Sequence, residues 1–345
     1  MRPQVRGRWF LSGTPSPEVS APGDQLLRRR AVTWPIDSRS ERNLRTSLDT
    51  IGDAATRAVM ARSALWSESR YLDFADASSG LGVYVRFGSY PNLGQNWLWV
   101  VVVAPGFPPW ILNVTDATQL EAADKMIWRT GAGVYAQLNE AADGSSFGLR
   151  VGELRDSSHS PRHPLRLDLV WTPVMEVFRY ASTTRLEQSC DVTGEVVMNG
   201  ETFAVSATGQ RDHSVGVRDW WRVPWLWAAG AVGSQVRFQV TKLSRKHAWG
   251  EGYMARGGSM APLNQIAAPE RSDRRESLTL SLDGIDVSCH PIAWTLLPLA
   301  SPEGKETVLH RALCKFSGVG AVGSGWLEWN VPAPRKRSSE VRVQH

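Results

Sequence analysis

Short runs in which apolar and polar residues alternate recur from about residue 71 to residue 330. Runs of about four to eight residues rich in Val, Leu, Phe and Trp are typical of half-buried β-strands. The dipeptides Asn199-Gly200 and Asp283-Gly284, which favour tight hairpins, lie between such runs. The pattern therefore predicts a mostly β protein. The expected strands are residues 81–87, 97–103, 133–138, 147–151, 165–171, 176–180, 184–188, 194–198, 202–207, 236–241, 251–254, 277–282, 285–289, 307–316 and 326–329.

The strand-like runs form two series, with a break near residues 173–176. Two sets of short strands at regular spacing favour two β-sandwiches or barrels, or one elongated pair. We therefore expect one β-domain over residues 43–175 and a second over residues 176–332. An irregular lead-in over residues 1–42 and a basic tail over residues 333–345 flank them.

One or two peripheral helices are expected beside the strands. Apolar residues, Leu44 and Leu48 among them, recur at helical spacing within residues 43–66. Residues 116–128 form a second candidate helix, in which Asp116 would cap the first turn.

The composition is that of a globular protein with a large aromatic interior. The chain has 345 residues, a formal net charge of +5, 42% hydrophobic residues and 21% charged residues, which excludes a disordered or fibrous chain. Its 16 tryptophans outnumber the 9 phenylalanines and 6 tyrosines together. Rings of this size have to be buried or to line a cavity, so we expect a large apolar cavity.

The compartment is predicted from targeting features and cysteines. The N-terminus carries charge without an apolar core region, which is unlike a secretory signal. The longest apolar run, residues 97–112, is interrupted by prolines and is shorter than the roughly 20 residues that span a bilayer. Cys190, Cys289 and Cys314 are too few for a disulfide framework. We expect a cytoplasmic protein with buried thiols and no stable membrane insertion.

Several motifs of cofactor and metal sites lack the context that they need. Residues 318–323 spell GxGxxG, but a strand-like run follows where a dinucleotide site has a helix. Residues 144–148 spell GxSxG without the flanking strand and helix of a nucleophile elbow. His159 and His163 are separated by Pro161, which prevents the helix that would align them on a metal. We predict no cofactor and no metal and, because the excess positive charge lies mostly in the tails, no nucleic-acid partner; the oligomeric state is not predicted.

The densest polar and aromatic cluster is residues 209–221, GQRDHSVGVRDWW. Arg211-Asp212 and Arg218-Asp219 stand seven residues apart beside several tryptophans. Charges next to so many rings are costly to bury unless they pair. The outer pairs are therefore as consistent with a buried ion-pair network as with a functional site. In the functional interpretation Arg218 and Asp219 hold the geometry, and Arg211 pairs with a carboxylate.

Asp212 and His213 are the central catalytic candidates. A carboxylic acid in an apolar pocket has a raised pKa and can stay protonated to donate a proton, and an adjacent histidine can relay one near neutral pH. Because successive strand residues point to opposite faces, both reach one pocket only if the backbone bends, as Gly209 and Gly216 would permit. Glu187, on the preceding strand, is a second candidate acid or an orienting group.

The segment RDHSVGVRDWW resembles the RDHSWGxRDW signature of the carotenoid 1,2-hydratase/AttH-like, lipocalin-like superfamily. Residues 71–76, 79–86 and 323–329 and the Thr193-Gly194 turn also resemble that family, in order, along about residues 65–330. The resemblance implies two lipocalin-like β-barrel domains packed together, the second carrying the signature and a lipophilic pocket near it. Characterised relatives are hydratases of isoprenoid double bonds, and similar scaffolds host polyketide and terpenoid cyclases.

The chain departs from the hydratase pattern at two places. Val215 replaces the signature tryptophan, and residues 238–240 read Phe-Gln-Val where carotenoid hydratases tend to carry Tyr-x-Asp. Both departures argue against carotenoid hydration itself. Nearby aromatic rings could stabilise a carbocation through their π faces, or could be core packing. The rings that we assign to substrate binding are Trp220, Trp221, Trp225, Trp227, Tyr84 and Trp97.

Two hypotheses for the function follow. The first is a cofactor-independent acid/base enzyme acting on a bulky isoprenoid, terpenoid or polyketide-like substrate. Protonation would lead to hydration, dehydration, isomerisation or cyclisation, which makes the enzyme a lyase of the hydratase type or an isomerase/cyclase. The second is a non-catalytic lipocalin-like carrier of a lipid, pigment or sterol, in which the same residues are structural. Because one fold hosts many functions, only the site can decide, and analogy favours the enzyme.

Overall fold

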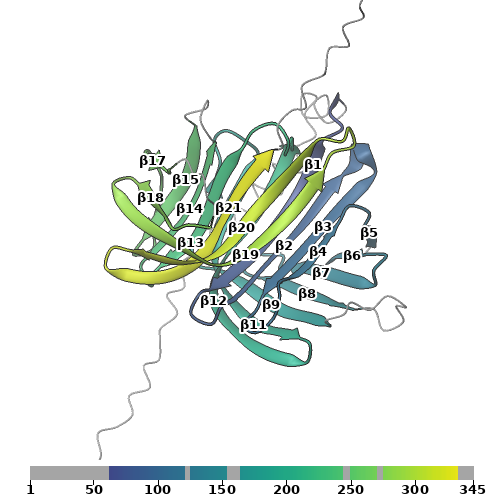
Figure 1. Cartoon of the computed structure of the whole chain (residues 1–345), viewed down its shortest axis with the longest axis horizontal. Helices are drawn as coiled ribbons and strands as arrows, with labels where there is room; N and C mark the ends of the chain where they lie inside the picture. The colour runs from purple at the N-terminus through teal and green to yellow at the C-terminus, as the bar shows by residue number, and fades with distance from the viewer. Residues whose placement is uncertain (1–61, 121–124, 154–163, 244–248, 270–274, 333–345) are drawn as a thin grey trace, which may run out of the picture. The chain divides into compact units, whose positions relative to one another are not determined.

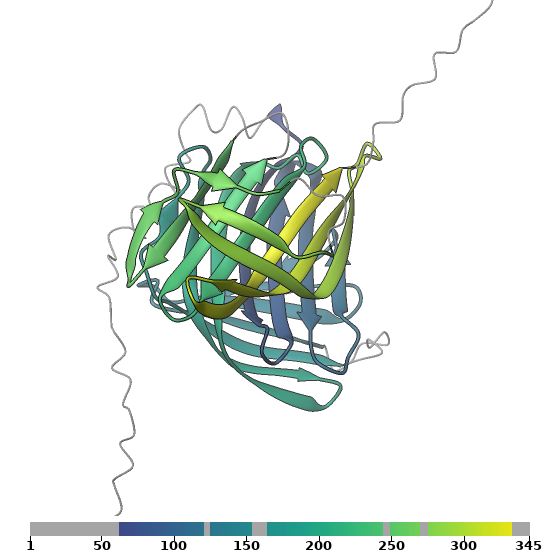
Figure 2. The same cartoon turned by 60° about the vertical axis from the view of Figure 1, so that its left-hand side comes forward.

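The computed structural model describes residues 62–120, 125–153, 164–243, 249–269 and 275–332, all within the compact unit Trp34–His345. The described strands form two antiparallel sheets, one of twelve strands and one of nine (Figures 1 and 2). Each sheet is strongly curved in both views. This arrangement confirms the mostly β fold with two lipocalin-like β units.

The first sheet contains β1 to β12 in the spatial order β4-β3-β2-β1-β12-β11-β9-β8-β7-β6-β5, with β10 paired to β11. The first and last strands of this sheet are therefore neighbours at its centre. The strands are β1 (Trp66–Asp76), β2 (Leu81–Tyr90), β3 (Gln95–Val103), β4 (Trp110–Val114), β5 (Thr118–Leu120), β6 (Lys125–Arg129), β7 (Val134–Glu140), β8 (Phe147–Glu153), β9 (Leu165–Pro173), β10 (Phe178–Arg179), β11 (Arg185–Met198) and β12 (Glu201–Val217), with the 3-10 helix η1 (Pro91–Leu93) after β2.

The second sheet has the order β16-β15-β14-β13-β21-β20-β19-β18-β17. As in the first sheet, its first and last long strands, β13 and β21, pair at the centre. The strands are β13 (Trp225–Val232), β14 (Val236–Leu243), β15 (Gly250–Arg256), β16 (Ser259–Pro262), β17 (Ile266–Ala267), β18 (Leu278–Leu282), β19 (Ile285–Ala300), β20 (Glu306–Gly318) and β21 (Ala321–Pro332).

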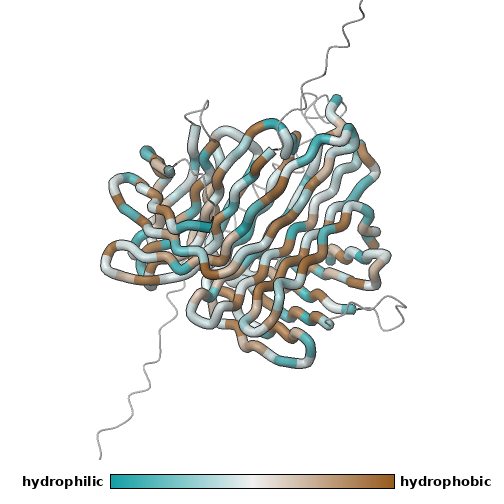
Figure 3. Tube along the Cα trace, viewed as in Figure 1, coloured by the Kyte–Doolittle hydropathy of each residue, from teal (hydrophilic) through white to brown (hydrophobic). Residues whose placement is uncertain are grey.

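Burial alternates along the strands, as the sequence pattern predicts. In β9, Leu165, Leu167, Leu169 and Trp171 are buried, and the residues between them are more exposed. Figure 3 shows the same alternation of hydrophobic and hydrophilic positions along many strands. This period of two gives each sheet an apolar face on which a core can form.

The buried apolar residues form a core on each sheet and one core that both sheets share. Trp171 belongs to the core of the first sheet, and Phe238 belongs to that of the second. The shared core takes Tyr84 and Trp97 from the first sheet and Trp326 from the second. The Trp326 indole donates to the carbonyl oxygen of Phe74 at 2.8 Å, which ties the sheets together across this core.

One of the two expected helices is wrong, and the other lies almost wholly outside the described residues. The candidate at residues 116–128 is wrong, because β5 and β6 occupy its described part. Pairing of β6 with β7 buries Trp128 against Phe87, so tertiary contacts override the local helical pattern. The candidate at residues 43–66 falls outside the described residues except for its end, where Trp66 begins β1.

The change from one sheet to the other does not lie near residues 173–176. Strands β10, β11 and β12 belong to the first sheet, because β11 pairs with β9 and β12 pairs with β1. The sheets change between Val217 and Trp225. The residue 175/176 boundary is therefore wrong as a division between sheets, and the signature segment lies in the first sheet rather than the second.

The predicted turns are confirmed. Asn199 and Gly200 join β11 to β12, and Asp283 and Gly284 join β18 to β19, all four with positive φ. Residues 318–323 form the turn and flanks of the β20–β21 hairpin, and residues 144–148 include the turn before β8. In the described part of the chain, no helix has the length and apolar character needed to cross a membrane.

Candidate functional site

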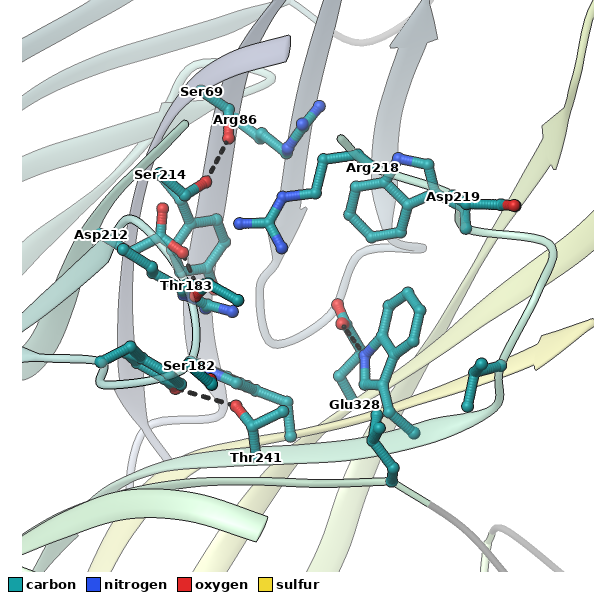
Figure 4. Close-up of a pocket in the computed structure, with 18 of the residues that line it drawn as sticks. Ser69, Arg86, Ser182, Thr183, Asp212, Ser214, Arg218, Asp219, Thr241 and Glu328 are labelled. Atoms are coloured by element: carbon teal, nitrogen blue, oxygen red, sulfur yellow. Dashed lines mark hydrogen bonds and ion pairs between the residues drawn. The ribbon is translucent and has the colours of Figure 1, made fainter. Parts of the chain in front are cut away.

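A cavity of ≈ 390 Å³ takes its walls from both sheets (Figure 4). Its volume lies within the range of about 300–1,000 Å³ that is typical of small-molecule sites. Both aromatic rings and charged side chains line it. The lining includes Tyr71, Arg86, Arg185, Asp212 and Ser214 from the first sheet and Trp225, Trp227, Arg311 and Glu328 from the second.

Strand β12 carries the signature segment without a break in register against β1. Side chains therefore alternate between the two faces of the sheet. Asp212 and Ser214 line the cavity, whereas Arg211 and His213 are on the other face. The expected bend that would bring Asp212 and His213 into one pocket is wrong.

Asp212 is held by a cation rather than by apolar groups. Its Oδ2 lies 2.7 Å from Nη2 of Arg185, and its Oδ1 has no hydrogen-bond partner among the described residues. The expected environment of a protonated acid in an apolar pocket is therefore wrong for this residue. A carboxylate with one oxygen held by a cation and the other buried without a donor has an oxygen that can accept a proton.

His213 lies outside the cavity. Its Nε2 is 2.9 Å from Oε1 of Glu68, which also contacts Arg70 at 3.0 Å. The hydrogen bond from His213, followed by the charge of Arg70, lowers the pKa of Glu68 to about 2 despite its partial burial. Because His213 belongs to this ion cluster, the structure does not place it as a proton relay beside Asp212.

Glu187 is fully buried directly behind the cavity wall. Its carboxylate accepts from Tyr180 Oη and Trp227 Nε1 at 3.2 Å each, and it pairs with Arg185. Burial, together with the negative charge of Asp212, raises the pKa of Glu187. Since Tyr180 and Trp227 line the cavity, Glu187 reaches the cavity through them.

Asp73 is a second buried carboxyl group, and it is not among the candidate site residues predicted from the sequence. The Tyr71 hydroxyl donates to its Oδ2 at 2.5 Å, and Tyr71 lines the cavity. Burial raises the pKa of Asp73 to about 7, although the charge of Arg311 opposes the shift. The Tyr71–Asp73 pair is visible in the sequence as Tyr-x-Asp, because residues two apart on a strand share a face. Strand β1 thus carries the Tyr-x-Asp pattern that residues 238–240 lack.

Gln210 joins these two carboxyl groups. Its backbone N–H donates to Asp73 Oδ1 and its side-chain Nε2 donates to Glu187 Oε2, both at 3.0 Å. A continuous chain of hydrogen bonds therefore runs from Tyr71 through Asp73, Gln210 and Glu187 to Tyr180. The tyrosines at both of its ends line the cavity.

The expected supporting network is only partly present. Arg211 donates to Gln188 Oε1 at 2.6 Å within the core of the first sheet, and its guanidinium lies 4.0 Å from the centroid of the Phe147 ring. Asp219 caps the following turn by accepting from the backbone N–H of Trp221, and its carboxylate points away from the cavity in Figure 4. No ion pair joins Arg218 to Asp219 among the described residues; Arg218 extends into the cavity instead.

The aromatic candidates divide between cavity wall and core. Trp220, Trp225 and Trp227 line the cavity. Trp221, Tyr84 and Trp97 do not line it and belong to the shared core of the two sheets. The structure thus places half of the predicted substrate-binding rings in the cavity wall and half in the core between the sheets.

An ion pair from the second sheet forms another part of the wall. Arg311 Nε lies 3.3 Å from Glu328 Oε2. The Arg311 guanidinium lies 4.2 Å from the ring centroid of Tyr84 and 5.0 Å from that of Trp227, so rings shield it from water. Trp225 Nε1 donates to Glu328 Oε1 at 3.1 Å (Figure 4). Within the described ranges, no three His, Cys, Asp or Glu side chains are grouped as metal ligands.

The fold and the cavity define a class: a protein of two curved antiparallel sheets with an aromatic cavity whose wall contains arginine–carboxylate pairs. A family model described as a domain of unknown function, DUF7064, matches residues 52–333, and the chain belongs to that family. A search of curated protein sequences gave no match.

Solved structures show where this fold recurs. The chain is similar to CghA, with a TM-score of 0.57 and 12% identity over 79% of this chain and 90% of CghA; CghA has also been solved with Sch210972. A putative AttH from Nitrosomonas europaea gives a TM-score of 0.49 and 14% identity over 77% of this chain and 92% of that chain. Kievitone hydratase from Nectria haematococca gives a TM-score of 0.47 and 10% identity over 77% of this chain and 89% of that chain. At these identities the similarity to CghA shows the fold alone.

Proposed function

We propose that the chain is an acid/base enzyme that acts on a bulky lipophilic molecule in this cavity by proton transfer alone. The observation that carries the proposal is the hydrogen-bond chain from Tyr71 to Tyr180, which connects two buried carboxyl groups to two hydroxyls at the cavity wall. Perturbed carboxyl groups behind a cavity are typical of acid/base sites. That a protein of the same fold, CghA, has been solved with Sch210972 supports a ligand-binding role for the cavity.

The acid in this mechanism is a tyrosine backed by a carboxylic acid. Burial raises the pKa of Tyr180 well above its usual value, so its hydroxyl keeps its proton. When Glu187 is protonated, it can donate to the oxygen of Tyr180 while the tyrosine hydroxyl gives its own proton to a C=C bond or carbonyl oxygen of the substrate. Tyr71 and Asp73 form an equivalent pair at the other end of the chain.

The base in this mechanism is Asp212. Arg185 fixes one of its oxygens, and the other is buried with no hydrogen-bond partner among the described residues. Loss of a proton from the protonated substrate to Asp212 completes an isomerisation or a cyclisation. Addition of a water molecule, deprotonated by Asp212, completes a hydration, and the reverse sequence is a dehydration. These outcomes make the chain a lyase of the hydratase type or an isomerase/cyclase, and the cavity rings would shield a developing cation.

The test is mass spectrometry of the small molecules that copurify with the protein from its native host. Tyr180→Phe removes the proposed acid and keeps the ring, and Asp212→Asn removes the proposed base and keeps the shape. Tyr135→Phe, on β7 and outside the cavity lining, is the matched control. A general acid or base contributes about a hundredfold or more to turnover, so both site variants should retain substrate while wild type and Tyr135→Phe hold its isomer or hydrate.

The result that overturns the proposal is the same unchanged lipophile in wild type and all three variants. The protein would then be a carrier, and the hydrogen-bond chain would be part of its architecture.

A further inference from the structure

Not every cation around the cavity is paired with a carboxylate. Two of the arginines in its wall each hold a carboxylate of the wall, and the other two have no carboxylate partner among the described residues. Buried or half-buried cations without a counter-ion are costly unless a ligand supplies one. The paired arginines are Arg185 and Arg311, and the remaining two are Arg86 and Arg218.

Arg86 is a fixed cation at one side of the cavity. Its side chain is buried at 4% exposure, and its Nη1 has no hydrogen-bond partner among the described residues. The guanidinium lies 4.7 Å from the ring centroid of Trp99 and 5.1 Å from that of Trp220. It packs directly on Gly88, where a Cβ would lie 2.2 Å from Nη1. These contacts hold the guanidinium without neutralising its charge.

Arg218 extends into the cavity in Figure 4, where its guanidinium lies on the side of Asp212 and Ser214. Within the described part of the chain its guanidinium makes no hydrogen bond and no ion pair. Burial, and after it the positive charges of Arg185 and Arg86, lower the pKa of Arg218 to about 10. At neutral pH the side chain is still charged, so it is available to an anionic ligand.

We propose that Arg218, with Arg86 beside it, binds a carboxylate of the lipophilic molecule that enters the cavity, so that the ligand is a carboxylic acid rather than a neutral hydrocarbon. A planar carboxylate fits the two parallel N–H groups of a guanidinium, and such forks are among the strongest polar contacts in proteins. The aromatic wall formed by Trp225 and Trp227 would take the apolar body. The inference names the substrate class of the proposed enzyme and in that sense rests on the proposed function.

The test uses two probes that differ only in the acid group, 4-(1-pyrenyl)butyrate and 4-(1-pyrenyl)butanol, with binding followed by energy transfer from the protein's tryptophans to pyrene. A charge-assisted contact is worth about tenfold to a hundredfold in affinity, so wild type should bind the acid tighter than the alcohol by about that factor. Arg218→Met should lose this preference and bind the alcohol unchanged, which also shows that its cavity is intact. Arg222→Met removes an exposed charge four residues along, outside the cavity lining, and should keep the preference.

Equal affinity of wild type for the acid and the alcohol overturns the proposal. So does a loss of affinity for the acid in Arg222→Met as large as the loss in Arg218→Met. If Arg218→Met does not fold, Arg218→Lys replaces it, and a several-fold loss of acid preference is expected because lysine lacks the fork. The test measures binding alone and does not require the protein to convert either probe into a product. The acid preference can therefore survive a failure of the acid/base mechanism, and the Tyr180→Phe result can survive a failure of the carboxylate site.

Discussion

Single side chains in this protein take their chemistry from burial more than from their neighbours in sequence. Asp73 and Glu187 are ordinary strand residues in the amino-acid sequence, yet both are buried beside hydroxyl and amide groups that the fold brings from other strands. Burial raises the pKa of both. This sets a dependence of stability on pH that can be measured.

Asp73→Asn should reduce the pH dependence of the free energy of unfolding between about pH 5 and 7, leaving the part that Glu187 contributes. In the folded protein Asp73 has a pKa of about 7, against an ordinary value of 3.8. Between these values the folded state holds one proton more than the unfolded state, so stability falls as pH rises, by about 1.4 kcal/mol per pH unit for each such proton. Urea unfolding at a series of pH values measures the slope. Asp168→Asn, at an exposed pair with Arg150, should keep the wild-type slope; a wild-type slope in Asp73→Asn would contradict the raised pKa.

His213→Gln should leave ligand binding and turnover unchanged, because His213 lies on the opposite face from the cavity. Its partner Glu68 has a side chain that is 38% exposed, so the loss of stability at neutral pH should stay below about 1 kcal/mol. The lowered pKa of Glu68 contributes stability that is present above about pH 4.5 and is lost as pH falls toward 2. The variant should therefore differ from wild type less at pH 3 than at pH 7, as urea unfolding can show. A large loss of turnover would return His213 to the catalytic role that the sequence suggested.

The residue-level candidates show what a sequence can and cannot predict. Asp212 was found because it stands in a recognisable segment, and the structure does place it at the cavity. Its partner Arg185 was not found, because only the register of β11 against β12 brings the two together. The Asp73 site was missed although its Tyr-x-Asp spacing is visible, because nothing local indicates that β1 lies beside β12 at the centre of the sheet.

At the scale of elements, β12 is the strand on which the site depends. It runs between β1 and β11, and both of these neighbours also carry residues that line the cavity. Period-two alternation predicts most of the strands, and it also explains why Asp212 and His213 face apart. It does not predict β5 and β6, because the burial of Trp128 against a distant strand overrides the local helical pattern.

Gly209→Ala should destabilise the protein by more than the about 1–3 kcal/mol of ordinary overpacking, because the added Cβ meets backbone. It would lie 2.2 Å from the carbonyl oxygen of Asp73 and 2.9 Å from Nε1 of Trp171. That indole donates to the same oxygen at 2.6 Å, so the hydrogen bond would be lost as well. Gly148→Ala in β8 is the matched control, since its Cβ finds no atom closer than 3.8 Å. Urea unfolding compares the two, and an equal, small effect would show that β1 and β12 are not packed as described.

At the scale of the whole described unit, each sheet has a core of its own, and a third core joins the two sheets. The residue 175/176 boundary rested on a break in the run of strands, and such a break does not reveal which strands pair. Tyr84 and Trp97 illustrate the consequence, because both were assigned to substrate binding and both instead fill the core between the sheets. A core built from two sheets predicts that they unfold together.

Trp326→Leu should therefore weaken both sheets at once. The ring packs edge-on against Tyr84 of the first sheet with ring centroids 5.4 Å apart, and its indole N–H donates to Phe74 of that sheet. Large-to-small changes at buried tryptophans cost about 3–5 kcal/mol when the ring is removed to alanine, so leucine should cost somewhat less. Hydrogen exchange followed by mass spectrometry should show protection falling together in β1, β2, β13 and β21. Trp294→Leu is the control, because Trp294 stacks on Trp329 within the second sheet and should loosen that sheet more than the first. Loss of protection confined to the second sheet in Trp326→Leu would mean that each sheet is stable without the other, and the cavity between them would then depend on a weaker association than the shared core implies.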